Sequence, residues 1–158
     1  MNIYIDMNIY NRMFDDQDQI TIKLDTIAID VIYELIGNGT CKLMWSYILE
    51  YENRNNPFPN RRERIGIISQ MRSDTILGSE DIINTAESIQ ALSKAKSKDA
   101  LHLACAVHSG CKYFITCDNG LLRTINHNNT ALINILGEMQ LLNPLDFIRK
   151  EMNIDVIG

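Results

Sequence analysis

The sequence predicts a three-layer α/β/α sandwich with a mainly parallel central sheet. Strand-like apolar segments, such as residues 2–5 and 112–117, alternate with stretches whose apolar residues recur every three or four positions. This alternation favours parallel strands, because a helix must return the chain to the start of the next strand. The continuous apolar run at 112–117 is typical of a central strand covered on both faces. The length fits a single domain over residues 1–158.

The N-terminal third has the pattern of a β-α-β unit. Residues 2–5 (NIYI) form the first predicted strand, and polar stretches after it fit a loop or a short helix. A helix is predicted over 17–36 from its three- and four-residue apolar spacing, and GNG at 37–39 ends it. CKLMW at 41–45 is the second predicted strand, and Ser46 can cap the helix that follows.

The rest of the chain continues the alternation after a break at NPFPN, where two prolines interrupt helical structure. Gly110 is placed as a helix stop ahead of the apolar strand. The elements predicted in this part are helices over 61–71, 80–92 and 97–110, a strand at 112–117, a short strand near 131–136 or 139–142, and a final helix from Pro144.

Composition indicates a globular cytoplasmic protein with no membrane partner. Apolar residues make up 46% and charged residues 22% of the chain, and no apolar run approaches the ~20 residues of a membrane helix. The formal net charge of −5 excludes bulk electrostatic attraction for nucleic acid. The cysteines lack zinc-site spacing and are predicted to be small buried hydrophobes, namely Cys41, Cys105, Cys111 and Cys117.

Two of the predicted strands end in an aspartate, Asp6 in IYIDMN and Asp118 in YFITCDNG. Ligands of open α/β sheets bind beyond the carboxyl ends of the strands, which places both carboxylates where chemistry is expected. Each aspartate alone can also be explained as a helix N-cap or a turn residue. Together they favour a functional site.

Glu52 is a third candidate, with Glu50 as its alternative. If Ser46 caps the helix, Glu52 falls on the same face as the apolar Ile48 and Leu49, while Glu50 points the opposite way. A charge on an apolar face is costly unless it is paired or bound to a cation. A shift in the helix phase would exchange the two roles.

Asp99 is the fourth candidate, in the first turn of KDALHLACAV. A negative charge there favours the helix dipole, which is a sufficient structural explanation. Asp99 also shares a face with Leu103 and Val107, in a helix that leads into the strand ending at Asp118. Carboxylates that converge repel one another unless a cation lies among them, and an oxygen-only site favours Mg²⁺ or Mn²⁺.

The order of these segments resembles the PIN domain, a family of metal-dependent nucleases that includes the VapC-type toxins of bacterial toxin–antitoxin pairs. The resemblance covers essentially the whole chain and depends on the N-terminal strand leading into DMN, and on SYILEYEN, KDALHLACA and TCDNGLL. By resemblance, Asp6, Glu52, Asp99 and Asp118 would be both catalytic residues and ligands of Mg²⁺ or Mn²⁺. Asn8 and Thr116 match nearby polar positions that orient ligands or water.

The resemblance implies a ribonuclease that hydrolyses phosphodiester bonds of single-stranded RNA. It also implies a possible antitoxin partner and a possible homodimer, without distinguishing a toxin from a housekeeping nuclease. Arg61, Arg62 and Arg64 form a candidate edge for the RNA backbone, although such a run is more often a solvated helix face. His102 is interpreted as a packed or solvated residue.

Two alternatives remain on the sequence alone. One is a receiver-like phospho-acceptor, which would need adjacent acids after the first strand and a lysine after a late strand. A dehalogenase-like phosphatase is not among the two, because it would need DxD where this chain has DMN. A non-catalytic RNA- or protein-binding module with a PIN-like fold is the other alternative. It would be expected to lose carboxylates, whereas this chain has one at each expected position.

Overall fold

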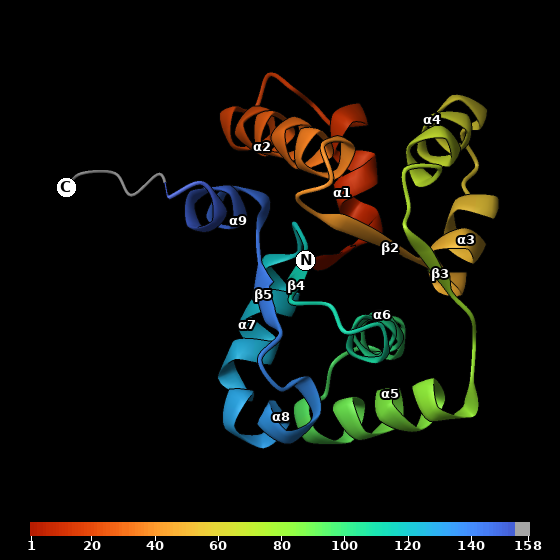
Figure 1. Ribbon diagram of the computed structural model, residues 1–158, viewed down its shortest axis with the longest axis vertical. Helices are drawn as coiled ribbons and strands as arrows, with labels where there is room; N and C mark the ends of the chain where they lie inside the picture. The colour runs from red at the N-terminus through yellow and green to blue at the C-terminus, as the bar shows by residue number, and fades with distance from the viewer. Residues whose placement is uncertain (154–158) are drawn as a thin grey trace.

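The central feature of the fold is a five-stranded sheet in the order β3-β2-β1-β4-β5, with every pairing parallel (Figure 1). The computed structural model describes residues 1–153. β1 lies in the middle, with Ile5 opposite Ile115 of β4 and Tyr4 opposite Met44 of β2. This register brings the carboxyl ends of the three central strands to one edge.

The strands are β1 (Asn2–Ile5), β2 (Lys42–Ser46), β3 (Asp74–Ile76), β4 (Tyr113–Ile115) and β5 (Gln140–Leu142). The helices are α1 (Met7–Asn11), the short 3-10 helix η1 (Arg12–Phe14), α2 (Ile20–Gly37), α3 (Tyr47–Arg54), α4 (Pro59–Ser69), α5 (Glu80–Ser93), α6 (Ser97–His108), α7 (Asn119–His127), α8 (Asn129–Leu136) and α9 (Pro144–Glu151).

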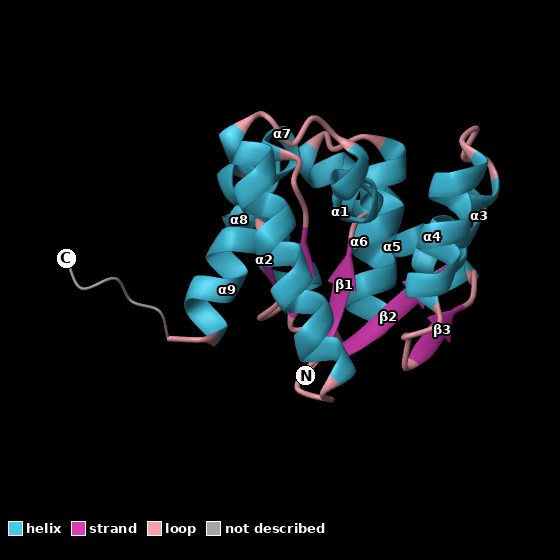
Figure 2. Cartoon of the chain, turned by 90° about the horizontal axis from the view of Figure 1, so that it is seen from above, coloured by secondary structure: helices cyan, strands magenta, loops and turns pink. Residues whose placement is uncertain are grey.

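Helices cover both faces of the sheet, which confirms the three-layer prediction. α2 and α9 pack together over one face, and α5 and α6 pack together over the other (Figures 1 and 2). α3 and α4 lie beside the edge formed by β2 and β3 (Figure 1). The strands are buried because both faces are covered, and Tyr4, Trp45 and Phe114 are at most 1% exposed.

Most predicted elements are present with ends shifted by a few residues. Ser46 caps α3 as predicted, its hydroxyl accepting from the Leu49 backbone N–H at 3.2 Å. The NPFPN break separates α3 from α4, with Pro59 in the first turn of the second helix. Gly110 adopts a φ of +67°, the left-handed conformation that follows a helix end.

The region after Asp118 differs from the sequence prediction. The segment 131–136, one of two candidates for the last strand, belongs to helix α8, and the strand is instead at Gln140–Leu142 within 139–142. The turn at Gly137 separates them with a φ of +59°. Apolar residues dominate both segments, so strand and helix could not be distinguished by apolar content. Helix α7 and the short strand β3 were not predicted.

Two predictions from the composition concern the cysteine side chains and membrane-spanning helices. All four cysteines are free thiols, three of them buried and Cys117 partly so. Within residues 1–153, no helix is both long and apolar enough to cross a bilayer.

Candidate active site

An acidic cavity of about 390 Å³ opens at the carboxyl ends of the central strands. Its walls come from α1, η1, α3, α6 and the start of α7, segments far apart in the sequence. The predicted carboxylates therefore lie around one space. The lining residues are Asp6, Met7, Asn8, Asn11, Asp15, Glu52, Lys98, Asp99, His102 and Asp118.

Asp6 is the most buried carboxylate of the cavity, with 6% of the residue exposed. It follows β1 directly and caps α1, with Oδ1 accepting from the Met7 backbone N–H at 2.8 Å. Oδ2 accepts from Asn8 Nδ2 at 3.1 Å and from Thr116 Oγ1 at 2.9 Å. Burial raises the pKa of Asp6, although these hydrogen bonds favour its ionised form. The carboxylate is fixed in place and retains a free lone pair on Oδ1.

Thr116 and Asn8 connect the ends of β1 and β4. The fully buried Thr116 hydroxyl donates to Asp6 and accepts from the Asp118 backbone N–H at 3.0 Å. Asn8 Oδ1 accepts from the Cys117 backbone N–H at 2.9 Å. These bonds hold the two strand ends together, and with them the start of the segment that carries Asp118.

Asp118 is the N-cap of α7, and its Oδ1 accepts from the Leu121 backbone N–H at 3.0 Å. The structural explanation considered for Asp6 and Asp118 therefore holds for both, since each caps a helix. It does not compete with the site, because both carboxylates also line the acidic cavity.

Glu52 is held by a buried chain of hydrogen bonds that the sequence did not reveal. Its Oε1 contacts Nε2 of His102, whose Nδ1 lies 2.6 Å from the Tyr4 hydroxyl. The Tyr4 hydroxyl in turn lies 2.6 Å from Ser46 Oγ. One assignment of protons satisfies every member: Ser46 donates to Tyr4, Tyr4 to His102 Nδ1, and His102 Nε2–H to Glu52.

Glu50 lies outside the acidic cavity. Its Oε2 accepts from the indole N–H of Trp45 at 2.9 Å, and its Oε1 lies 3.7 Å from the guanidinium of Arg54. The side chain of Glu50 is 49% exposed, against 16% for that of Glu52. The helix phase set by Ser46 thus directs Glu52, and not Glu50, into the site.

Asp99 lies in the first turn of α6 and is half-buried. Its pKa is raised, first by burial and then by repulsion from Asp6 and Asp118. The three aspartates therefore sense one another across the cavity. No hydrogen bond to the Asp99 carboxylate is found within residues 1–153, and the positive charge of Lys96 offsets the repulsion only in part.

The donor set is suited to a hard divalent cation, but it is not assembled into a coordination shell. Carboxylate oxygens without cysteine are the preferred ligands of Mg²⁺ and Mn²⁺, and a cation would relieve the repulsion felt by Asp99. In the described chain, no group of three or more His, Cys, Asp or Glu side chains is arranged to hold a metal ion. The cavity fits a cation by chemistry and charge.

The three arginines expected at an RNA-binding edge do not share one position. Arg61 stacks over the Phe58 ring, 4.4 Å from its centroid, and lines a groove next to the acidic cavity. Arg62 donates to the Asn56 carbonyl at 3.0 Å. Arg62 and Arg64 are exposed and line neither space.

Sequence reasoning missed several residues of the cavity. Lys98 is adjacent to Asp99 and could have been included on that ground. Asp15, which pairs with Arg12 at 3.1 Å, lies in a polar stretch with no periodicity to orient it. His102, interpreted as packed or solvated, is packed at 2% exposed, and its contact with Glu52 depends on the distance between α3 and α6.

Comparison with known proteins gives one level of similarity, that of the fold. No protein-family model and no curated protein matches the chain. Among solved structures, the fold is similar to a chain in the crystal structure of VapBC2 from Rickettsia felis bound to a DNA fragment from their promoter. That match has a TM-score of 0.53 at 13% identity and covers 90% of this chain and 98% of that chain. The chain thus shares an α/β fold with a component of a VapBC complex.

Proposed function

We propose that this protein is a metal-dependent endoribonuclease that hydrolyses phosphodiester bonds of single-stranded RNA. The observation that carries the proposal is that Asp6, Glu52, Asp99 and Asp118, from four separate segments, line one cavity at the carboxyl ends of parallel strands. The likeness to a VapBC2 chain supports it, because VapC is the class that the sequence motifs resemble.

In this proposal the four carboxylates hold Mg²⁺ or Mn²⁺. When bound, the cation supplies a Lewis acid that neutralises charge developing on a phosphoryl oxygen and promotes ionisation of water. Thr116 and Asn8 fix Asp6, and His102 fixes Glu52. Lys98, which also lines the cavity, offers a positive charge to a phosphate of the RNA strand near the carboxylates.

Hydrolysis by water predicts the ends of the products. With water as the nucleophile and the 3′-oxygen as the leaving group, cleavage should leave a 5′-phosphate and a 3′-hydroxyl. Products that end in a 2′,3′-cyclic phosphate would exclude this mechanism. Mass spectrometry of the fragments distinguishes the two.

The central experiment compares cleavage of single-stranded RNA with Mg²⁺, with Mn²⁺ and with EDTA. We expect cleavage with either metal and none with the chelator. Equal behaviour in all three conditions would exclude the proposal. An Asp99→Asn variant prepared in parallel identifies a contaminating nuclease, since such an activity would survive the substitution.

The proposal extends to a toxin of a toxin–antitoxin pair, acting in the cytoplasm and inhibited by a partner protein, with a homodimer as the possible assembly. Its support is the likeness to a chain of VapBC2. Induced expression of the chain should arrest growth of a bacterial host, and expression of the Asp99→Asn variant should not. Growth arrest by both would dissociate toxicity from the site.

A non-catalytic binding module is the competing function, favoured by the lack of a preassembled three-ligand group in residues 1–153. Such a module would bind RNA equally well with metal or chelator and leave it intact. The cleavage experiment therefore separates both functions.

A further inference from the structure

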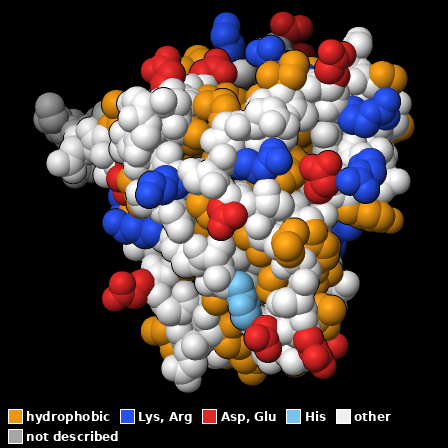
Figure 3. Space-filling view, turned by 45° about the vertical axis from the view of Figure 1, so that its right-hand side comes forward, with side chains coloured by type: hydrophobic (Ala, Val, Ile, Leu, Met, Phe, Trp, Pro, Cys, Tyr) orange, Lys and Arg blue, Asp and Glu red, His pale blue; other side chains and the backbone are white. Residues whose placement is uncertain are grey.

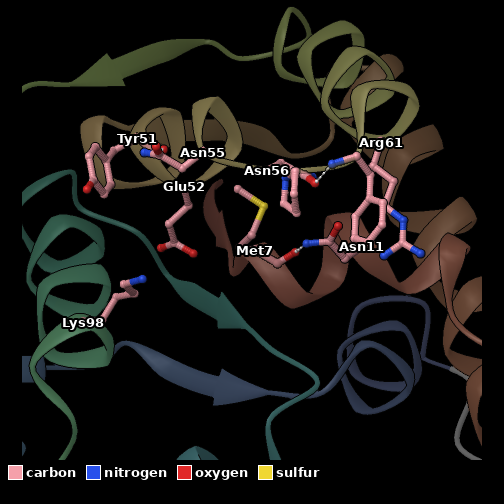
Figure 4. A pocket seen from close by; sticks show the side chains of 10 residues that line it. Met7, Asn11, Tyr51, Glu52, Asn55, Asn56, Arg61 and Lys98 are labelled. Atoms are coloured by element: carbon pink, nitrogen blue, oxygen red, sulfur yellow. Dashed lines mark hydrogen bonds between the residues drawn. The ribbon is translucent and has the colours of Figure 1, made fainter.

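A groove of about 400 Å³ adjoins the acidic cavity on the side of α3 and α4. We call it the aromatic groove and define it by Tyr51, Asn55, Asn56, Phe58, Arg61 and Lys98. The two spaces share Met7, Asn11, Glu52 and Lys98 as lining residues, so they are continuous. Figure 4 shows Glu52 and Lys98 projecting from α3 and α6 into the space they share.

The groove exposes flat surfaces that a globular fold usually buries. Tyr51 is 62% exposed and Phe58 is 52% exposed, while the other large aromatic residues of the fold lie in or against the core. The Arg61 guanidinium lies over Phe58 at 4.4 Å and over Phe14 at 5.3 Å from the ring centroids. The two rings therefore hold the planar, positively charged guanidinium in position. Aromatic rings and arginine planes are the surfaces on which unpaired bases stack.

Asn55 and Asn56 add one hydrogen-bond acceptor and one donor to the groove, and the orientation of each side-chain amide is fixed. Asn55 Nδ2 donates to the Tyr51 carbonyl at 2.8 Å, and Asn56 Oδ1 accepts from the Phe58 backbone N–H at 3.1 Å. These backbone partners determine which amide atom is which. Over residues 1–153, Asn55 Oδ1 and Asn56 Nδ2 have no hydrogen-bond partner and remain available to the edge of a base.

The charges agree with a nucleic-acid strand. Arg61 and Lys98 are positive, whereas the adjoining acidic cavity is negative and would need a cation to accept a phosphate. Basic and acidic side chains are mixed on the face that carries α3 and α4, so the attraction is local (Figure 3). A peptide would need anionic groups for the groove and cationic groups for the cavity. A nucleotide offers a base and a phosphate within one unit.

We propose that the aromatic groove binds an unpaired nucleobase of the RNA, next to the phosphate held at the acidic cavity. Phe58 with Arg61 forms one stacking surface and Tyr51, at the opposite end of the groove, forms a second, while Asn55 and Asn56 between them offer contacts to the edge of a base (Figure 4). The inference rests on the proposed function, since it takes the acidic cavity as the place of cleavage. It accounts for the single-stranded substrate of the proposed function, because a paired base is not free to enter the groove.

The test measures binding without cleavage. A short single-stranded RNA, carrying 2-aminopurine next to an uncharged methylphosphonate linkage that needs no cation at the acidic cavity, is titrated with the full chain in EDTA, and both anisotropy and quenching are recorded. Phe58→Ala and Tyr51→Ala should each weaken binding about five- to tenfold and reduce quenching. Tyr51→Phe should retain both signals. The matched control is Ile67→Ala, which removes an equally exposed apolar side chain (58% exposed) outside the groove.

The arginine pair separates stacking from general charge. Arg61→Ala and Arg64→Ala remove the same charge from the same helix, but only Arg61 lines the groove. Arg61→Ala should lower the slope of log affinity against log salt by about 0.7, the value for one single-strand phosphate contact, and Arg64→Ala should leave the slope unchanged. Arg61→Lys should restore the slope without restoring quenching, because an ammonium has no plane.

The outcomes are independent of the nuclease test. Wild-type affinity and quenching in both aromatic variants would overturn the inference and leave the groove to a protein segment, even if the protein cleaves RNA. Equal losses in Arg61→Ala and Arg64→Ala would also overturn it. Selective loss in the groove variants of a protein that does not cleave would support the groove and reject only the nuclease.

Discussion

At the scale of single residues, the site depends on side chains that hold other side chains. The Asp6 carboxylate is fixed by three donors, and Glu52 is fixed by His102, which is itself fixed by Tyr4. The pKa of the Tyr4 hydroxyl is raised well above its usual value by burial, so the hydroxyl remains protonated and donates to His102. Small changes far from any substrate should therefore alter the position of a carboxylate.

Tyr4→Phe tests this hydrogen-bond chain. Removing the hydroxyl leaves His102 Nδ1 and Ser46 without their partner, so the free energy of unfolding should fall by about 1–2 kcal/mol. The rate of RNA cleavage should fall about five- to tenfold because Glu52 is no longer held. Tyr10→Phe is the matched control, since the buried Tyr10 hydroxyl has no partner in the described chain. If both variants cleave like the wild type, the chain does not position Glu52 for catalysis.

Asp6→Asn tests the most buried carboxylate of the acidic cavity. Asparagine is also a good N-cap, so the variant should keep the fold and lose about 1 kcal/mol or less of stability. It should lose metal affinity and cleavage, because the charge is removed. Circular dichroism and metal titration give the two readouts. Cleavage at the wild-type rate would show that Asp6 is not a ligand, and loss of folding would show that the hydrogen bonds from Asn8 and Thr116 need a carboxylate at this position.

Asp99→Asn tests the burial and repulsion that raise the pKa of Asp99. The folded pKa of Asp99 lies above its usual value of 3.8, so the folded state binds the proton more tightly than the unfolded state. Protonated Asp99 therefore stabilises the folded state fully below pH 3.8. This stabilisation is lost as the pH rises through the folded pKa of Asp99. The variant avoids this loss. In EDTA it should match the wild type below pH 3.8 and exceed it at pH 7.

Solvent screening of a half-exposed group limits the expected gain at pH 7 to about 0.5 kcal/mol. Urea unfolding at the two pH values measures the difference. A variant less stable than the wild type at pH 7 would contradict the repulsion among Asp99, Asp6 and Asp118.

At the scale of elements, the sequence was most informative where a cap and a periodic pattern agreed. Ser46 set the phase of α3, and that phase favoured Glu52 over Glu50 on the sequence, while the structure places Glu52 in the wall of the cavity. The sheet order, with β1 between β2 and β4, could not be derived from local patterns. For the same reason the contact between Glu52 and His102, fifty positions apart in the chain, was not predictable. Capping is local, whereas helix-to-helix distance is a property of the packed structure.

The segment 131–136, one of the two candidates for the last strand, shows what controls the boundary between α8 and β5. Gly137 has φ +59° and ψ −128°, a conformation that a side chain strongly disfavours, and it reverses the chain between helix and strand. A glycine before an apolar run is compatible with either element on sequence alone.

Gly137→Ala and Gly66→Ala form a matched pair of substitutions. A Cβ meets no atom within 4 Å at either position, so only the backbone conformation differs. Gly66 is inside α4, and its substitution should stabilise the protein by about 0.5–1 kcal/mol. Gly137→Ala should destabilise it by about 1–3 kcal/mol. Chemical denaturation measures both, and equal effects of the two substitutions would contradict the conformation of Gly137.

At the scale of the whole molecule, the net charge of −5 coexists with a negative cavity. A cation that binds only the folded state should raise the melting temperature, and the stabilisation should grow with the logarithm of the cation concentration relative to Kd. At a hundredfold excess over Kd the gain is about 2.7 kcal/mol.

Calorimetry with Mn²⁺ and with EDTA tests this prediction. The wild type should melt at a higher temperature in Mn²⁺ and return to its lower value after chelation, while Asp99→Asn should change little. Zn²⁺ serves as the chemical comparison, because an oxygen-only site gives it less advantage. Identical melting of wild type and variant in Mn²⁺ would remove Asp99 from the cation site.

The double duty of Asp6 and Asp118 as helix starters has an evolutionary corollary. A homologue without hydrolytic activity would still need both residues in order to begin α1 and α7. Their presence in a homologue is therefore weak evidence for enzyme activity. Asp99 caps no helix, and its structural contribution is limited to a favourable negative charge in the first turn of α6. Its retention or loss among homologues is therefore the sharper marker of a working enzyme.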